Sequence, residues 1–564
     1  MKQLAGILIP GILAVLAVVL LVVWTSTGPT GVLQARVSGL DGAPQNPHAA
    51  GENTGRPAER RAAGEPVRGP GVASKVAGSW PWFRGPDLDL IGKDPAVRLA
   101  RKWPAEGPKR LWAVELGDGY AAPAISSGRV YILDHVHDAA MDLVRGLSEA
   151  QRTLLADTLA PLSTGSLDKA EPVLRQLFPV AGTAAAEGQT VSQGDYASLK
   201  QALGRLLSGD REKLLRALRE NALEDIDASA DTLRCLSLDD GKEIWRNGYR
   251  VFVPLNHGRS RTVPAVVGRY VISLGPQCHV ACWDADTGKA HWLIDLVLDY
   301  GTKVPEWYAG QCPLVDPKTD RLVLAPSGKA LLIAVDYKTG KVLWQCPNPR
   351  GWTMTHVSIT PMDFAGRRMY VYCGSRGVAG VDAETGALLW DTLDWQGKMA
   401  TCPSPLVVGP DRLFFSGGYN AGSLMLRLQQ QGDRIVAQEV FRLSAKEFGA
   451  EQQTPVLFGN HLYGVRQHDK KLVCLDLNGK EVWSSGRDKF GSAPYMIADG
   501  LIYALNDEAW LTMAEATPAG YKPLARAEVI PEGHDSWGPM ALVHGRLIVR
   551  DMTRMVCLDV AEGR

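Results

Sequence analysis

The sequence has no excess charge of either sign and no Cys-Cys or Cys-x-x-Cys pair. Lysine plus arginine and aspartate plus glutamate each number 61 in the 564 residues, so nothing in the charge balance points to nucleic acid as a partner. The nine cysteines form no Cys-x-x-Cys pair and no Cys-x-x-Cys-His motif, which excludes haem attachment through that motif. Cys278 and Cys282 come closest to a metal site, but their neighbours are typical of a strand. We therefore predict no metal, and interpret the thiols as buried apolar side chains.

The N-terminus holds a long run without charge. Leu4 to Trp24 contains 21 uncharged residues, which as a helix would span roughly 30 Å, enough to cross a bilayer. A cleaved signal peptide has a shorter apolar core and a small-x-small site, so an uncleaved anchor is favoured over cleavage. Lys2 precedes the run and the next basic residue is Arg36, so the positive-inside rule places residues 1–3 in the cytoplasm. We predict a single-pass inner-membrane protein with its folded part on the periplasmic side.

Residues 25–78 are rich in Gly, Pro and Ala and show no apolar period, which predicts a disordered linker. Beyond it, one pattern recurs: a strand, a tight Asp/Asn–Gly turn and a second strand that carries a Trp. Gly supplies the positive φ that such hairpin turns require. The five clearest copies are Cys235–Trp245, Cys282–Trp292, Ala334–Trp344, Gly380–Trp390 and Cys474–Trp483.

Eight prolines mark strand starts between these hairpins. After a first interval of 141 residues, their spacings are 49, 48, 44, 50, 39 and 45, close to the length of a four-stranded propeller blade. Proline suits the first residue of a strand, where no ladder donor is yet needed. The prolines are Pro123, Pro264, Pro313, Pro361, Pro405, Pro455, Pro494 and Pro539.

The Trp-type strands also number eight. Six carry Trp, Phe441 replaces the seventh, and the eighth, near Leu524 to Ala527, is degenerate. The hairpin that opens at Val556 to Val560 has no second strand after it, whereas Arg110 to Leu116 has no partner before it. We therefore expect an N-terminal strand to close the last blade, which removes the free sheet edges of a ring. The Trp-type strands are marked by Trp112, Trp245, Trp292, Trp344, Trp390, Phe441, Trp483 and the Leu524–Ala527 segment.

The Asp-x-x-Thr-Gly-Lys-x-x-Trp hairpins resemble the tryptophan-docking repeats of the PQQ-like, or quinoprotein alcohol dehydrogenase-like, propeller superfamily. Trp80-Pro-Trp-Phe-Arg-Gly-Pro86 is similar to the segment that often precedes blade one in bacterial members. The resemblance covers roughly residues 80–136 and 230–564. It implies an all-β fold, an eight-bladed β-propeller over residues 79–564, in which the Trp side chains pack between blades.

The first proline interval is about 95 residues longer than a blade needs, and the excess has the composition of helices. Ser148 to Gln151 predicts a capping box, and 195–207 and 210–223 each place leucines on one face. We predict an α-helical insertion in blade one over residues 138–229. It is either a cap that packs on its own apolar faces or a docking module for another protein.

In this superfamily, ligands sit in the funnel where each Trp strand leads to the next Pro strand. Mapping that region onto this chain yields cationic, aromatic and amide side chains, which suit a small polar ligand or a peptide. The alternative is that these loops are polar because water fills the channel. The candidates are Tyr120, His257, Arg261, Thr262, Glu306, Trp307, Gln311, His356, Tyr419, Asn420, Gln452, Gln453 and Trp537.

The resemblance to quinoprotein dehydrogenases implies a possible cofactor, PQQ with calcium, but the pattern departs from theirs. Those enzymes carry adjacent cysteines and a carboxylate base beside calcium. This chain has no Cys-Cys pair, and the nearest carboxylates are Glu306, Glu451 and Asp535. The leading hypothesis is a membrane-anchored scaffold that binds a protein or ligand, similar in plan to the BamB-like scaffolds of outer-membrane assembly. Its partner would be an envelope protein, bound through the propeller loops or the insertion. The alternative is a PQQ-dependent oxidoreductase that uses the funnel.

Overall fold

The computed structural model describes residues 61–162, 167–181, 190–223, 226–254, 256–396 and 400–563. Within these ranges, no helix combines the length and the apolar character needed to cross a bilayer. The predicted cytoplasmic end at 1–3, the predicted anchor at 4–24 and most of the predicted linker lie outside the described residues.

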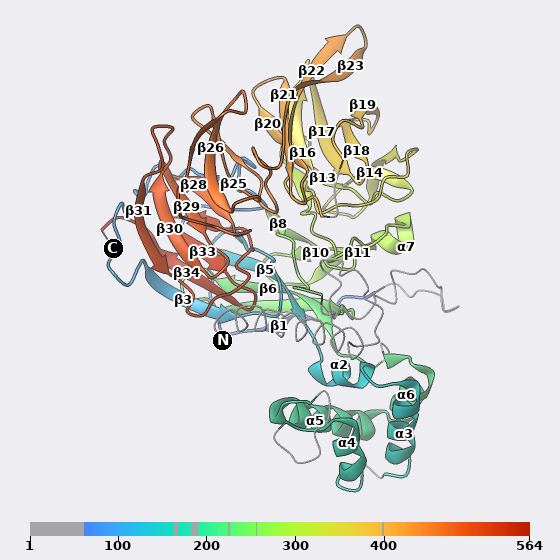
Figure 1. Cartoon of the computed structure of the whole chain (residues 1–564). Coiled ribbons are helices and arrows are strands. Elements are labelled where there is room, and N and C mark those ends of the chain that lie inside the picture. The colour runs from blue at the N-terminus through green and yellow to red at the C-terminus, as the bar shows by residue number, and fades with distance from the viewer. Residues whose placement is uncertain are drawn as a thin grey trace, which may run out of the picture. The chain divides into compact units, whose positions relative to one another are not determined.

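Eight antiparallel sheets follow one another along the chain, each with four strands of a blade (Figure 1). Blade one contains β4 (Ala124–Ser126), β5 (Arg129–Val136), β6 (Ala230–Ser237) and β7 (Glu243–Arg250). Blade two contains β8 (Ala265–Val267), β9 (Tyr270–Leu274), β10 (His279–Asp284) and β11 (Ala290–Asp295), followed by α7 (Leu296–Tyr300). Blade three contains β12 (Leu314–Asp316), β13 (Arg321–Leu324), β14 (Ala330–Val335) and β15 (Val342–Pro347). Blade four contains β16 (Thr360–Phe364), β17 (Arg367–Gly374), β18 (Gly377–Asp382) and β19 (Leu388–Thr392).

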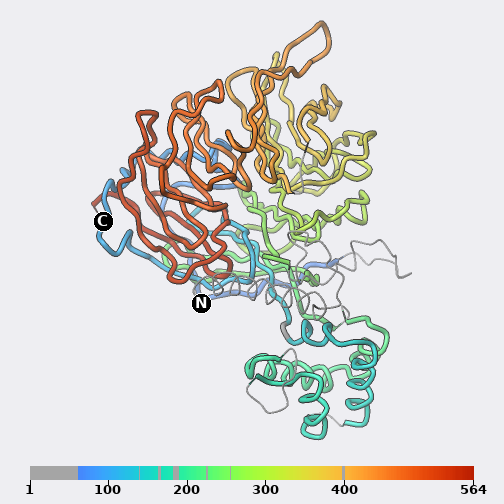
Figure 2. The backbone as a smooth tube through the Cα atoms, in the orientation of Figure 1, coloured from blue at the N-terminus to red at the C-terminus, as the bar shows by residue number. Residues whose placement is uncertain are grey.

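The remaining blades repeat this order, and the β22–β23 hairpin of blade five has the longest strands (Figure 2). Blade five contains β20 (Leu406–Val408), β21 (Arg412–Gly417), β22 (Gly422–Gln431) and β23 (Arg434–Leu443). Blade six contains β24 (Val456–Phe458), β25 (His461–Arg466), β26 (Lys471–Asp476) and β27 (Glu481–Ser484). Blade seven contains β28 (Tyr495–Ala498), β29 (Leu501–Leu505), β30 (Trp510–Glu515) and β31 (Pro523–Glu528). Blade eight contains β32 (Ala541–Val543), β33 (Arg546–Arg550), β34 (Arg554–Asp559) and β3 (Lys109–Glu115).

The ring closes as the sequence predicts. β3 pairs antiparallel with β34, so a strand from before blade one completes blade eight. The short first strand of each blade is the inner one, because β32 contacts β4 and β4 contacts β8 around the ring. Each marker proline lies at or just before one of these inner strands, where no partner strand needs its missing donor. The eight-bladed propeller is therefore confirmed.

The docking side chains join each blade to the next. The indole nitrogens of Trp112, Trp245, Trp292, Trp344 and Trp483 donate to carbonyl oxygens of Leu238, Ala285, Tyr337, Ala383 and Thr517 in the following blade, at 2.8–3.1 Å. The turn glycine of the next hairpin lies directly against the ring. At Gly288, for example, φ is +75° and a Cβ would meet Trp245 at 2.6 Å. The repeat thus needs its Gly both for the turn and for close packing between blades.

Two blades depart from this scheme. In blade five, Phe441 occupies the docking position opposite Met425, as the sequence predicts. In blade seven, Ala525 occupies it opposite Met513, which confirms the degenerate eighth strand. Trp390 docks differently, because the long β22–β23 hairpin has no Asp-x-x-Thr-Gly turn to receive it. Its nitrogen points to Met369 Sδ, 3.4 Å away in its own blade.

Part of the predicted linker, 61–78, is ordered against the sheets, so the prediction of disorder is wrong there. β1 (Val67–Arg68) pairs with β7 as a fifth strand of blade one. The physical reason is the free outer edge of β7, which offers main-chain partners to any extended segment. The following segment then lines the inner strands. Trp80 exchanges main-chain hydrogen bonds with Ile125, and β2 (Ile91–Gly92) runs parallel to β28.

The excess in the first proline interval forms helices between β5 and β6. They are α2 (Ala139–Arg145), α3 (Glu149–Leu159), α4 (Glu171–Leu177), α5 (Gln193–Gly209) and α6 (Arg211–Glu220). The predicted capping box is present at Ser148 and Gln151. Leucines of these helices, such as Leu155, Leu203 and Leu218, are buried in a hydrophobic cluster of their own. The helices therefore carry a separate core beside that of the sheets.

Candidate functional site

The loops that lead from the outer strand of one blade to the inner strand of the next converge at one end of the propeller. Three of the predicted residues meet there in a stack. The rings of Tyr120 and Trp537 lie 4.9 Å apart at an angle of 28°, and the Arg261 guanidinium carbon lies 4.9 Å from the Tyr120 ring centre. These side chains come from the loops between blades eight and one, seven and eight, and one and two. The stack therefore joins four blades.

Arg261 has little else to hold it. Its Nη2 donates to the Asn256 carbonyl oxygen at 3.2 Å, and its Nε is buried without a hydrogen-bond partner. Burial lowers the pKa of this guanidinium, and no carboxylate in the described ranges forms an ion pair with it. By contrast, the buried Arg550 donates to four main-chain carbonyl oxygens, those of Gly117, Ala121, Asp551 and Met552. Arg550 is a structural arginine, whereas Arg261 has unused donor capacity.

Further buried polar atoms around the funnel also lack partners. The Tyr120 hydroxyl, the Trp307 indole nitrogen and Nδ1 of His356 have none among the described residues. Tyr120 and Trp307 are only 5% and 8% exposed, so these atoms lie well inside the molecule. Most buried polar atoms in proteins are hydrogen-bonded, and each exception calls for an explanation. An accumulation of exceptions in one funnel indicates a place that water or a ligand fills.

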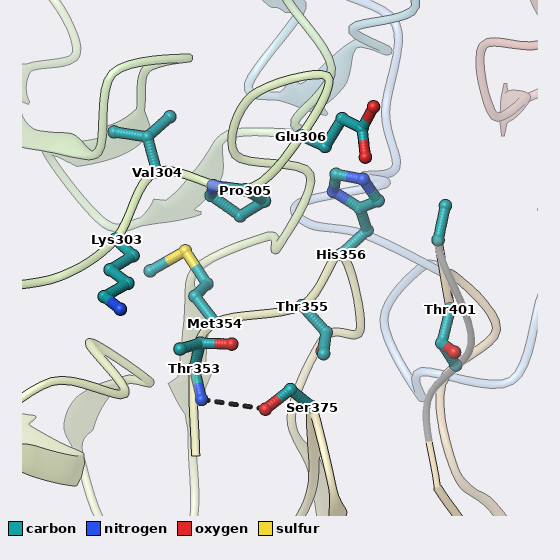
Figure 3. Close-up of a pocket in the computed structure, with 11 residues that line it drawn as sticks. Lys303, Val304, Pro305, Glu306, Thr353, Met354, Thr355, His356, Ser375 and Thr401 are labelled. Carbon is teal, nitrogen blue, oxygen red and sulfur yellow. Dashed lines mark hydrogen bonds between the residues drawn. The ribbon is translucent and has the colours of Figure 1, made fainter. Parts of the chain in front are cut away.

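A cavity of about 230 Å³ opens beside the stack, between the loops of blades two to five (Figure 3). Its polar lining includes Lys303, Glu306, Thr355, His356, Ser375 and Thr401. The Ser375 hydroxyl accepts from the Thr353 main-chain nitrogen at 3.0 Å, which holds two neighbouring loops together. The Glu306 and His356 side chains lie at the opposite side of the cavity from Lys303 (Figure 3). The cavity thus combines hydroxyl groups with one group of each charge.

The electrostatics of the funnel favour neutral side chains around Arg261. Burial, followed by the nearby Arg261 charge, lowers the pKa of His356 to about 3, so its imidazole is neutral at physiological pH. Burial also raises the pKa of Tyr419 to about 12, with Cys402 and Glu451 adding to the effect. His356 and Tyr419 therefore surround the positive charge of Arg261 with neutral side chains.

Other candidates are held by the protein itself. Thr262 donates to the Leu274 carbonyl oxygen, Gln311 accepts from the Ala325 nitrogen, and Gln453 donates to the Trp537 carbonyl oxygen. Thr262 and Gln453 have structural roles in the loops, whereas the side-chain nitrogen of Gln311 is buried without a partner among the described residues. His257 and Asn420 are exposed, while Tyr419 and Gln452 are half-buried. His257 approaches Trp307 edge to face, with ring centres 6.4 Å apart.

The backbone of these loops is unusual. His257, Trp307, Tyr308, Tyr419 and Asn420 all have φ between +53° and +71°. Bulky side chains avoid this region, and such strain gathers at binding sites. Tyr308 is anchored by its hydroxyl, which donates to the Pro254 carbonyl oxygen at 2.5 Å. The strained turns thus hold aromatic rings in fixed orientations around the funnel.

Several residues of the site were not predicted. Asp507 accepts from the Trp537 indole nitrogen at 2.8 Å and from the Ser492 main-chain nitrogen at 2.9 Å. These bonds orient the Trp537 ring in the stack. Asp507 and Ser375 lie between the second and third strands of their blades. Because strands alternate in direction, these turns share an end with the loops that precede each proline. Strand order alone would have located them.

The site does not fit a quinone–calcium centre of the dehydrogenase type. Calcium needs six to eight oxygen ligands. Glu451, one of the nearest carboxylates, already accepts from Lys470, Ser492 and Gln467 at 2.5, 2.6 and 2.9 Å. Asp535 pairs with His534 at 3.2 Å. Among the described residues, no three Asp, Glu, His or Cys side chains are grouped in a way that could hold a metal.

Fold and repeats together define a class: an eight-bladed β-propeller of the PQQ-like repeat type, with a polar funnel at one end. A family model described as outer membrane protein assembly factor BamB matches residues 229–485, somewhat less than half of the chain. The chain thus carries a PQQ-like, BamB-like propeller. None of the curated protein sequences matches it.

Several solved structures are similar to this chain at low sequence identity. BamB from Moraxella catarrhalis is 13% identical with a TM-score of 0.40, over 58% of this chain and 93% of that protein. Quinohemoprotein alcohol dehydrogenase from Comamonas testosteroni is 12% identical with a TM-score of 0.35, over 86% of this chain and 81% of that enzyme. A europium-containing methanol dehydrogenase is also 12% identical with a TM-score of 0.35, over 84% and 89% of the two chains.

Proposed function

We propose that this protein is a BamB-like binding propeller that holds a ligand in its funnel without performing chemistry on it. The observation that carries the proposal is the set of unpaired donors around Arg261. Leaving a buried polar group unsatisfied costs about 1–3 kcal/mol. Tyr120, Trp307 and Arg261 each carry one such atom, so a ligand that supplies acceptors would recover a large part of this cost.

The stack suggests what the ligand looks like. A guanidinium over an aromatic face is stabilised by the ring and remains able to donate in its own plane. Trp537 and Tyr120 add flat apolar surface beside it. Donors around a cation, next to stacked rings, favour an anionic or carbonyl-rich ligand with a planar part. A peptide segment that ends in a carboxylate has this chemistry, as does a small aromatic acid.

The place of the protein in the cell belongs to the same proposal. The uncharged run at 4–24 supports an anchor in the inner membrane, with the propeller on the periplasmic side. An envelope protein would be the partner, bound through the propeller loops or the helical insertion. Capture of envelope proteins by the full-length chain, compared with a variant lacking residues 138–229, tests this part. Recovery of none above background would count against a scaffold, and equal recovery by both forms would rule out docking through the insertion.

The funnel is tested by titrating the full-length protein in detergent with anilinonaphthalene sulfonate, an aromatic anion that fluoresces when bound. We expect saturable binding that weakens at least about tenfold in Arg261→Gln, because a charge-assisted hydrogen bond is lost. Arg269→Gln is the matched control, since Arg269 is 65% exposed and pairs with Asp284 away from the funnel. Equal affinity of the wild type and Arg261→Gln would refute a ligand site at the stack.

The same titration with PQQ, with and without calcium, addresses the oxidoreductase alternative. Because the carboxylates near the funnel do not fit a calcium centre, we expect no calcium-dependent binding. Calcium-dependent binding of PQQ, together with reduction of an acceptor dye, would replace the binding proposal with an enzymatic one.

A further inference from the structure

The helical insertion is tied to the funnel by a buried arginine. Arg259 is 1% exposed and lies two residues before Arg261. Its Nη1 donates to the Asp118 carboxylate at 2.8 Å, and its Nη2 faces Asp142 in helix α2 at 3.4 Å. Its Nε donates to the Val253 carbonyl oxygen at 2.8 Å, within the loop between blades one and two. One side chain therefore connects the insertion with two of the three loops that form the stack, those of Tyr120 and Arg261.

The loop that carries Tyr120 and the loop that carries Arg261 are also joined by main-chain hydrogen bonds. The Ser260 carbonyl oxygen accepts from the main-chain nitrogens of Tyr120 and Ala121, at 2.6 and 2.9 Å. Gly119 and Gly258 meet so closely that a Cβ on Gly258 would lie 2.7 Å from Gly119 Cα. A movement of Arg259 therefore reaches Tyr120 as well as Arg261.

A second contact from α2 reinforces the first. The Arg145 guanidinium carbon lies 3.5 Å from the ring centre of Phe252, which belongs to the same interblade loop. Arg145 also pairs with the Asp227 carboxylate at the other end of the insertion. Arg145 therefore joins the start of the insertion, in α2, and its end, at Asp227, to the loop that carries Arg261.

We infer that helix α2 is a regulatory clamp on the funnel: through Asp142 and Arg145 it holds the loops of Arg261 and Tyr120 in their binding arrangement. A ligand in the funnel and a partner that displaces α2 then oppose each other, because coupling between two sites is reciprocal. This inference rests on the proposed function for its ligand. Its mechanical part, the clamp, is independent of any ligand.

Hydrogen exchange of the full-length protein tests the clamp. In Asp142→Asn/Arg145→Gln we expect amide exchange of residues 256–262 and 117–121 to rise about fivefold, a typical size for such coupling. The matched control is Asp157→Asn/Arg219→Gln, which removes an exposed ion pair of 3.0 Å between α3 and α6, within the insertion. The control leaves exchange at the funnel loops unchanged.

Coupling is tested with anilinonaphthalene sulfonate as the probe. In the wild type, the probe slows exchange of residues 139–145 as well as of the funnel loops. In the clamp variant, α2 is no longer protected and the probe binds about fivefold more weakly. Probe binding that protects the funnel loops but not α2 in the wild type would overturn the inference. Unchanged exchange at 256–262 in the clamp variant would also overturn it. Raised exchange in a protein that binds no probe would support the clamp and refute the proposed function instead.

Discussion

The indole nitrogen of Trp245 donates a hydrogen bond of 3.0 Å to the Ala285 carbonyl oxygen in the next blade. Trp245 is fully buried, so this contact lies inside the seam between blades one and two. We expect Trp245→Phe to lower the free energy of unfolding by about 1–2 kcal/mol, since packing is largely kept and one bond is lost. Trp245→Ala removes the packing too and costs about 3–5 kcal/mol. Urea denaturation followed by circular dichroism measures both. No loss in Trp245→Phe would contradict a role for the bond, and equal losses in both variants would contradict a role for the packing.

Trp390→Phe is expected to cost less than Trp245→Phe. Its nitrogen points to Met369 Sδ at 3.4 Å rather than to a carbonyl oxygen, and a thioether is a weak acceptor. Denaturation of the two variants side by side measures the difference. A larger loss at Trp390 would mean that its indole has a role beyond this contact.

Gly288→Ala tests the second half of the docking repeat. The new methyl group would meet Trp245 at 2.6 Å, in addition to the strain of φ +75°. We expect a loss of about 2–4 kcal/mol from overpacking and backbone strain together. Gly268→Ala is the control, because its φ is +55° but nothing lies within 4 Å. Its loss is limited to about 1 kcal/mol of backbone strain. The melting temperatures of the two variants distinguish packing from strain.

His356 makes the protein sensitive to acid. Its pKa falls from 6.5 to about 3 on folding, chiefly through burial. Between pH 6.5 and 3, His356 is therefore protonated in the unfolded chain but neutral in the folded protein. Stability present above pH 6.5 is therefore lost as the pH falls toward 3, by at most about 1.4 kcal/mol per pH unit. We expect His356→Gln to flatten this dependence. The same substitution at the exposed His468 serves as control, and unfolding at several pH values gives the slopes. Identical slopes for His356→Gln and the wild type would contradict the assignment.

Removal of β3 opens the ring. A variant whose residues 109–115 are replaced by a glycine–serine linker of the same length keeps β1 and β2 but leaves β34 without the partner that pairs with it through six residue pairs. We expect broader unfolding and faster proteolysis of blade eight, because an unpaired strand edge is exposed. Cleavage sites mapped by mass spectrometry should cluster at 541–559. Cleavage spread evenly over the blades would argue against a fastening role for β3.

The propeller could be predicted from the sequence because the same structural requirements recur in every blade. Each blade needs an inner strand, a turn glycine and a docking ring, so their spacing survives even where Phe441 or Ala525 replaces Trp. The pairing of β1 (Val67–Arg68) could not be predicted from the sequence. Two extended residues have no period, and what orders them is the free edge of β7, which lies far along the sequence.

The funnel was only partly predictable for a related reason. Strand order placed Tyr120, Arg261 and Trp537 at one end of the ring, but not in one stack. Whether a polar side chain there is free or satisfied depends on neighbours from other blades. The Thr262 hydroxyl is held by a main-chain group, whereas the polar atoms of Tyr120 and Trp307 are not, and no local sequence pattern separates these residues.

The pairing of β3 with β34 also has a consequence for the order of events during synthesis. The N-terminal strand of blade eight leaves the ribosome about 440 residues before the strand that it pairs with. Blades one to seven can form in turn, but β3 cannot pair with β34 to close the ring until residue 559 has been synthesised. Until then, β3 has no partner strand and its edge stays unpaired.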